Sequence, residues 1–118
     1  PGLDSSGITL IESLGYLDFL CLLRHAALAV VDSGGVQVET TYLRVPCLTV
    51  RANTEWTVTV TEGTNRLVTT DTRELVAAIN EVLAHDWSGQ GSGREPKLPE
   101  LWEGKAAARM ASVMCSLD

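Results

Sequence analysis

A short apolar run that ends in a Ser-Gly-Gly turn is the feature that most constrains how this chain can fold. Residues 26–31 are apolar, Asp32, Ser33, Gly34 and Gly35 follow, and the sequence then takes on a helical pattern. This order predicts a buried strand, a tight turn and a helix whose unpaired backbone N–H groups face outward beyond the end of the strand. The start of such a helix is a place where anions bind.

The residues of this turn suit a nucleotide diphosphate. Gly34 and Gly35 carry no side chain where a diphosphate has to come close, and the Ser33 hydroxyl can donate to a phosphate oxygen. Glu39 lies four residues after Gly35, one turn along the same helix, and its carboxylate can accept hydrogen bonds from paired hydroxyls such as a ribose diol. The same residues also suit an ordinary strand-to-helix turn with a serine cap, so both interpretations stay open.

Alternating strand and helix patterns predict an α/β fold. We expect three strands separated by two helices, and then one more strand at an edge of the sheet. The strands are predicted at Ile8–Ile11, Ala27–Val31, Cys47–Val50 and Arg66–Val68, and the helices at Tyr16–Ala26 and Gly35–Leu43. Short connections between such elements favour a parallel sheet covered by helices, with ligands bound beyond the carboxyl ends of the strands.

Two more helices are expected in the second half of the chain. The first begins at Asp71-Thr72 and carries an apolar stripe of Leu75, Val76, Ile79, Val82 and Leu83. Asp86–Pro99 is rich in Gly, Ser and Pro and predicts a flexible loop. The last helix has apolar positions at Ala106, Met110, Val113, Met114 and Leu117, and this face requires a partner surface.

Composition excludes several classes of protein. The chain of 118 residues is one domain at most, and its formal charge of −6 argues against general nucleic-acid binding. No apolar run approaches the roughly 18 residues that span a membrane. Cys21, Cys47 and Cys115 predict reduced packing residues of a cytosolic protein, and His25 and His85 have no metal-ligand spacing, so no metal is expected.

Six segments together resemble the non-hydrolysing UDP-N-acetylglucosamine 2-epimerases. They are Gly15–Leu20, Asp32–Gln37, Val45–Arg51, Asn53–Glu55, Gly63–Val68 and Leu101–Ala106, in the order and spacing of that family. The resemblance implies a Rossmann-like parallel sheet with helices on both faces, within a two-lobed fold like that of the GT-B glycosyltransferases. Residues 1–118 match only the later, carboxyl-terminal part of the UDP-binding lobe, so the amino-terminal lobe is expected to be missing from this chain.

The resemblance also implies a reaction. The family reverses the configuration at sugar carbon 2, interconverting UDP-N-acetylglucosamine and UDP-N-acetylmannosamine without a cofactor: UDP is eliminated to leave an unsaturated sugar, and its re-addition gives the epimer. The acid and base carboxylates belong to the missing lobe, so we expect no catalytic residue here and no activity from these 118 residues alone. We expect the whole protein to be a cytoplasmic enzyme that acts on a UDP-sugar and forms a homodimer at full length.

Carried over by position, the resemblance assigns several contacts to UDP. Ser33, Gly34 and Gly35 would hold the phosphates, Glu39 the ribose hydroxyls, and Phe19 would lie beside the uracil. From the residues alone, Phe19 is instead a core residue of an apolar helix. Arg51 is another phosphate candidate, although an arginine at a strand end is also compatible with a purely structural role.

Some positions depart from the family pattern. Thr54-Glu55-Trp56-Thr57 replaces the usual Thr-Glu-Arg-Pro, so Trp56 stands where an arginine contacts the phosphates, and Arg44 replaces a glycine after the helix. A neutral indole cannot supply that charge. The alternatives are therefore an orphan nucleotide-binding module without catalysis, or the lobe of a hydrolysing epimerase or of a GT-B glycosyltransferase.

Overall fold

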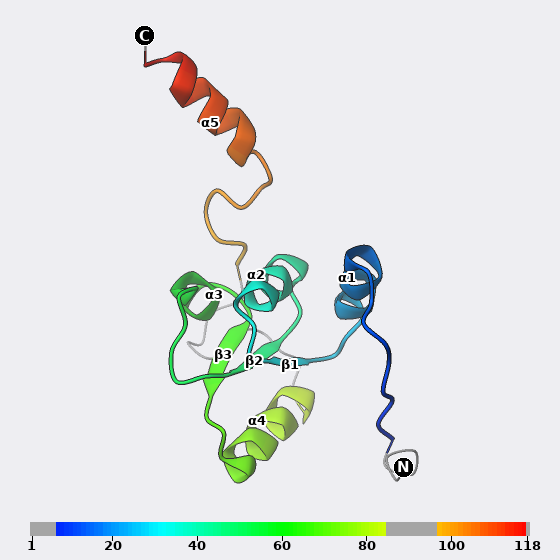
Figure 1. The fold of residues 1–118 in the computed structure, drawn as a ribbon. Helices are drawn as coiled ribbons and strands as arrows, with labels where there is room; N and C mark the ends of the chain where they lie inside the picture. Colours follow the sequence, from blue (N-terminus) through cyan, green and yellow to red (C-terminus); the bar gives the residue numbers. More distant parts are fainter. Residues whose placement is uncertain (1–6, 85–96, 118) are drawn as a thin grey trace.

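Three parallel strands form the centre of the molecule in the computed structural model, which describes residues 7–84 and 97–117. The strands are β1 (Ala29–Val31), β2 (Cys47–Val50) and β3 (Asn65–Val68), and they lie in the order β1-β2-β3. All pairs are parallel, as Figure 1 shows. The predicted strands at 27–31, 47–50 and 66–68 are therefore confirmed with small changes at their ends.

Helices cover both faces of this sheet. They are α1 (Tyr16–Arg24), α2 (Gly34–Leu43), α3 (Thr57–Thr61), α4 (Thr72–Ala84) and α5 (Ala106–Cys115). In Figure 1, α2 and α3 lie on one side of the strands and α4 lies on the other. The predicted Rossmann-like α/β sheet is confirmed.

The side chains of β2 alternate between these two faces, as expected for a strand. Leu48 points toward α4 and forms an apolar cluster with Val68, Ala78 and Val82. Cys47 points the opposite way and packs with Leu23 of α1 and Ala29 of β1. The core therefore consists of two thin layers, one on each face of the sheet.

Helix α4 begins where the sequence predicts. Asp71 Oδ1 accepts hydrogen bonds from the backbone N–H groups of Arg73 and Glu74, both at 3.0 Å. These are two of the N–H groups that the first turn of a helix leaves without a partner. The predicted stripe is partly wrong, because Val76 and Leu83 are exposed while Ala78 is buried. The small side chain of Ala78 lets the helix approach the sheet closely.

One predicted strand is absent, and one helix was not predicted. Ile8–Ile11 forms no strand, and its side chains are exposed, because a strand needs a neighbour to accept its hydrogen bonds and this segment runs outside the sheet (Figure 1). The polar, threonine-rich stretch after Arg51, for which no element was predicted, contains α3. Of the predicted loop 86–99, residues 86–96 lie outside the described part of the chain.

The last helix extends away from the sheet (Figure 1). None of its residues is buried, and Met110, Val113 and Met114 are exposed. The radius of gyration is 17.0 Å, compared with about 13 Å for a compact domain of 100 residues. The predicted apolar face is therefore present, and no surface within residues 7–84 or 97–117 buries it.

The three cysteines differ in their surroundings. Cys47 is buried, and burial raises the pKa of its thiol. Cys21 and Cys115 are exposed, so the prediction that all three are packing residues is wrong for these two. Both lie on helix faces that no other described element covers.

Candidate functional site

The turn between β1 and α2 is the centre of the candidate site. Ser33 precedes α2 with an extended backbone (φ −81°, ψ 135°) and makes no side-chain capping hydrogen bond. Its hydroxyl is exposed, so it does not serve as the ordinary serine cap that the sequence also allowed. The turn thus presents an open hydroxyl and the first N–H groups of a helix at the carboxyl end of a parallel strand.

The two glycines of the turn have different surroundings. A Cβ atom added to Gly34 would lie 3.1 Å from Trp56 Nε1 and even closer to Glu55 Oε1, so the side chains of the loop that follows β2 lie directly over this glycine. A Cβ atom added to Gly35 would meet only Ser33 Oγ, at 4.0 Å. Gly34 therefore allows a protein segment to approach, while Gly35 leaves space for a ligand.

The loop after β2 brings charged and aromatic side chains to this turn. Arg51 follows the last residue of β2, and its Nη1 lies 3.1 Å from Glu55 Oε2. Glu55 leans over Gly34, and Trp56 is 40% exposed with its indole N–H beside the same glycine. Of the two candidates from the sequence, Trp56 therefore lies next to Gly34, and Arg51 is linked to the turn through its ion pair with Glu55.

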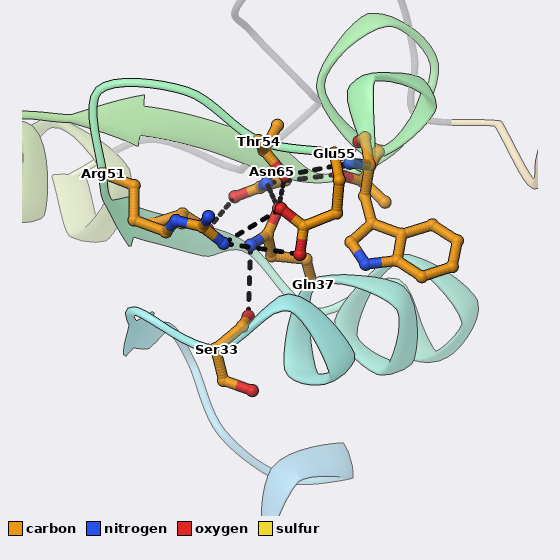
Figure 2. A network of polar contacts seen from close by, with 9 residues as sticks. Ser33, Gln37, Arg51, Thr54, Glu55 and Asn65 are labelled. Atoms are coloured by element: carbon orange, nitrogen blue, oxygen red, sulfur yellow. Dashed lines mark hydrogen bonds and ion pairs between the residues drawn. The ribbon is translucent and has the colours of Figure 1, made fainter.

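A network of buried polar groups connects the turn to the loop and to β3 (Figure 2). Gln37 is 0% exposed; its Nε2 donates to the Ser33 carbonyl at 3.1 Å, and its Oε1 accepts from Thr54 Oγ1 at 2.6 Å. The same oxygen accepts from Asn65 Nδ2 at 3.0 Å. Sequence reasoning assigned no role to Gln37 or Asn65, although polar side chains at a core position of a helix and in a short strand were a signal.

Asn65 extends the network to two threonines. Thr49 Oγ1 donates to Asn65 Oδ1 at 2.7 Å, and Asn65 Nδ2 also donates to Thr59 Oγ1 at 3.2 Å. Thr59 in turn donates to the Trp56 carbonyl at 2.7 Å. Strands β2 and β3 and helix α3 are thereby fixed relative to the turn.

Glu39 and Phe19 lie apart from this network. Glu39 lines a pocket of about 450 Å³ between α1, α2 and residues 101–106. Partial desolvation and the neighbouring Glu39 carboxylate raise the pKa of Tyr16, which lines the same pocket. Phe19 packs on the cluster of Leu23, Ala29 and Cys47, as expected from the sequence alone. The remaining lining residues are Leu20, Val38, Tyr42, Leu43, Leu101, Trp102, Gly104 and Ala106.

The described residues form neither a metal site nor a membrane span. Among residues 7–84 and 97–117, no three His, Cys, Asp or Glu side chains come together in a way that could hold a metal ion. No helix in the described part of the chain is long and apolar enough to cross a membrane.

Comparisons with known proteins give a consistent result. Residues 2–115 match the family model described as UDP-N-acetylglucosamine 2-epimerase. The UDP-N-acetylglucosamine 2-epimerase of Methanocaldococcus jannaschii is 42% identical over 103 residues, which are 83% of this chain and 28% of that protein. The enzyme of the same name from Escherichia coli K12 is 35% identical over 107 residues, which are 91% of this chain and 28% of that protein.

A solved structure is also similar. The crystal structure of the Methanocaldococcus jannaschii UDP-GlcNAc 2-epimerase in complex with UDP-GlcNAc and UDP has a TM-score of 0.76 and 35% identity, and the match covers 96% of this chain and 29% of that chain. The chain therefore spans little more than a quarter of the length of these relatives. Because the family match extends over almost every residue, this chain belongs to the UDP-N-acetylglucosamine 2-epimerase family.

Proposed function

We propose that this chain is the UDP-binding portion of an epimerase that interconverts UDP-N-acetylglucosamine and UDP-N-acetylmannosamine. Residues 1–118 would be the later part of the carboxyl-terminal lobe, and Ser33, Gly34 and Gly35 would hold the phosphates. The observation that carries the proposal is the open turn before α2, where an uncapped Ser33 hydroxyl lies beside a glycine with free space above it.

In the proposed reaction the chain would hold UDP while the sugar reacts. The C2–H bond breaks, a base takes the proton, and the C1–O bond breaks with its electrons leaving on UDP. Re-addition of UDP to the unsaturated sugar and return of a proton to the other face of C2 give the epimer. In this non-hydrolysing scheme the product stays linked to UDP, and the acid and base carboxylates come from the other lobe.

Further site residues belong to the proposal. Glu39 would accept hydrogen bonds from the ribose hydroxyls, Phe19 would lie on the uracil side, and Arg51 or Trp56 would face the phosphates. The side chain of Arg51 already pairs with Glu55, so it would have to exchange a carboxylate for a phosphate. The whole enzyme would be a cytoplasmic homodimer.

Titration calorimetry of the 118-residue protein tests the nucleotide site. We expect the protein to bind UDP and to bind uridine more weakly. Ser33→Ala should reduce the binding free energy of UDP by about 0.5–1.5 kcal/mol, because one hydrogen bond is lost. Ser116→Ala is the matched control, because Ser116 is exposed at the end of α5. Equal affinity of Ser33→Ala and the unchanged protein for UDP would remove the turn from the site.

Activity is tested separately. The 118-residue protein is incubated with UDP-N-acetylglucosamine in deuterated water, and the sugar C2 position is followed by NMR. We expect no deuterium at C2 and no epimer, because no acid or base carboxylate is assigned to these residues. Epimer formed by this protein alone would overturn that assignment.

A nucleotide-binding module without catalysis is the second candidate. The observation that favours it is Trp56, a neutral side chain that lies beside Gly34, where the family pattern has an arginine. Sedimentation and thermal melting separate the two: an independent module melts cooperatively as a defined species, whereas a piece of a larger lobe associates through its exposed apolar faces.

A further inference from the structure

Gln37 joins three segments that a bound phosphate would need in one arrangement. It receives a hydrogen bond from the loop after β2 through Thr54, receives another from β3 through Asn65, and donates its own to the carbonyl of Ser33. All of these groups surround a side chain with no exposure to solvent. Figure 2 shows the amide of Gln37 between Ser33 below and Thr54 and Asn65 above.

The hydrogen-bond donors and acceptors of the network fix which end of each side-chain amide, in Gln37 and in Asn65, is oxygen and which is nitrogen. The Thr49 hydroxyl donates to the Asn65 oxygen, so the Asn65 nitrogen faces Gln37 and donates to its oxygen. The Gln37 nitrogen is then the group that faces the Ser33 carbonyl, which can only accept. A buried network whose members are all satisfied holds its atoms in one geometry, since any other leaves a buried group without a partner.

The loop is held by the same contacts. Thr54 Oγ1 donates to Gln37 and accepts a hydrogen bond from the backbone N–H of Trp56 at 3.0 Å. The position of Trp56 beside Gly34 therefore depends on Thr54, and through it on Gln37. Without this connection the loop and the turn could move independently.

We infer that Gln37 is a positioning residue, which sets the geometry of the Ser33–Gly35 turn and of the loop above it for binding a diphosphate. This inference rests on the proposed UDP site and deepens it. Gln37 itself is buried below the turn and touches no ligand. Its effect is on where the Ser33 hydroxyl and the N–H groups of α2 point, so it concerns the diphosphate and not the nucleoside.

Calorimetry with UDP and with uridine tests this separation. Gln37→Met keeps the length and volume of the side chain and removes all three hydrogen bonds. We expect about tenfold weaker UDP binding by Gln37→Met, while uridine binding is unchanged. In a 15N-labelled sample, the amide signals of Gly34 and Gly35 and the indole signal of Trp56 should shift together.

Thr54 provides the second variant, because it is only half-buried and its replacement disturbs folding less. Thr54→Val removes the hydroxyl and should weaken UDP binding as much as Gln37→Met does. Thr54→Ser keeps the hydroxyl and should bind UDP as tightly as the unchanged protein. Thr61→Ala is the control, because the Thr61 hydroxyl bonds only within α3.

The outcomes separate this inference from the proposed function. If the unchanged protein binds UDP and Ser33→Ala weakens it, while Gln37→Met and Thr54→Val bind UDP normally, the positioning role is overturned and the site remains. Equal weakening of UDP and uridine would also overturn it, since it would indicate general loss of structure. If the unchanged protein shows no preference for UDP over uridine, the proposed function itself fails.

Discussion

The two faces of the sheet are held by different kinds of contact. The face covered by α4 is apolar, with Leu48, Val68, Ala78 and Val82 as its buried residues. The face toward α2 and α3 has the small apolar cluster of Leu23, Ala29 and Cys47 and is otherwise rich in buried polar side chains, namely Gln37, Thr40, Thr41, Thr49, Thr59 and Asn65. Apolar contacts are not directional, whereas each hydrogen bond fixes a distance and an angle.

The two faces therefore contribute different properties, one mainly stability and the other mainly geometry. Burial of a leucine or valine contributes about 1.5–3 kcal/mol, while a typical hydrogen bond contributes a net 0.5–1.5 kcal/mol. The α4 face therefore supplies more of the stability per side chain. The polar face supplies the geometry of the turn at Ser33 and of the loop at Trp56, which is the property that a binding site needs.

The largest effect is expected from Leu48→Ala on the apolar face. Leu48 is completely buried, and such a truncation costs about 2–5 kcal/mol of unfolding free energy. Denaturant unfolding followed by circular dichroism measures this loss. The UDP affinity of the folded protein should not change, because Leu48 points away from the turn.

Leu83→Ala is the control for this variant, since Leu83 lies on α4 and is exposed. Its unfolding free energy should change by less than about 0.5 kcal/mol. If Leu48→Ala weakened UDP in conditions where the protein is still folded, the two faces would not have separate tasks.

The apolar face was also the more predictable of the two. The strands are short apolar runs, and the start of α4 is marked by Asp71, so local sequence was enough to locate these elements, although not to place Val76, Ala78 and Leu83 correctly on α4. The first strand was predicted at Ile8–Ile11 for the same reason and is absent, because hydrogen bonding to a neighbouring strand cannot be read from one segment. The pattern at Ile8–Ile11 showed only that the side chains suit a strand.

The polar face was predicted only in part. The turn at Ser33–Gly35 and its neighbours Arg51 and Trp56 were identified because glycine, serine and charge carry local signals. Helix α3 and the role of Gln37 were missed, because Gln37 and Asn65 are 28 residues apart and their contact forms only in the folded chain. No element was predicted in the threonine-rich stretch after Arg51, yet Thr59 lies there in α3 and is buried, with hydrogen bonds to Asn65 and to the Trp56 carbonyl.

On the α2 side, Glu39→Ala should reduce affinity and leave stability almost unchanged. Loss of charge-assisted hydrogen bonds to the ribose predicts UDP binding weaker by about 1.5–3 kcal/mol. Calorimetry measures the change, with Glu62→Ala as a control at an exposed carboxylate. Unchanged affinity of Glu39→Ala would exclude Glu39 from the nucleotide site and leave it as the partner of Tyr16.

A smaller effect in the opposite direction is expected from Trp56→Arg. The side chain lies beside Gly34, so a guanidinium there would face the phosphates and tighten UDP by about 0.5–1.5 kcal/mol. Added salt should reduce this gain. Trp56→Leu is the matched control, because it removes the indole without adding charge and should give no gain. Equal or weaker binding by Trp56→Arg would mean that position 56 does not face the nucleotide.

The smallest effect is expected from a substitution at the C-terminal end of α2. It tests whether UDP binding depends on the stability of the whole helix or only on the geometry of its first turn. Arg44 ends α2 with a left-handed backbone (φ 59°, ψ 37°), a conformation that glycine adopts without the steric cost of a Cβ atom. Arg44→Gly relieves about 1–2 kcal/mol of left-handed strain and gives back about 0.4–1 kcal/mol to the freer unfolded chain. It should therefore stabilise the protein by about 0.5–1 kcal/mol, whereas Arg44→Ala, which also removes the charge but keeps a Cβ, should not. UDP affinity should be the same in both, because the network at Gln37 holds the turn independently of this end. A gain in affinity that follows the gain in stability would mean instead that the turn is set by the stability of the helix as a whole.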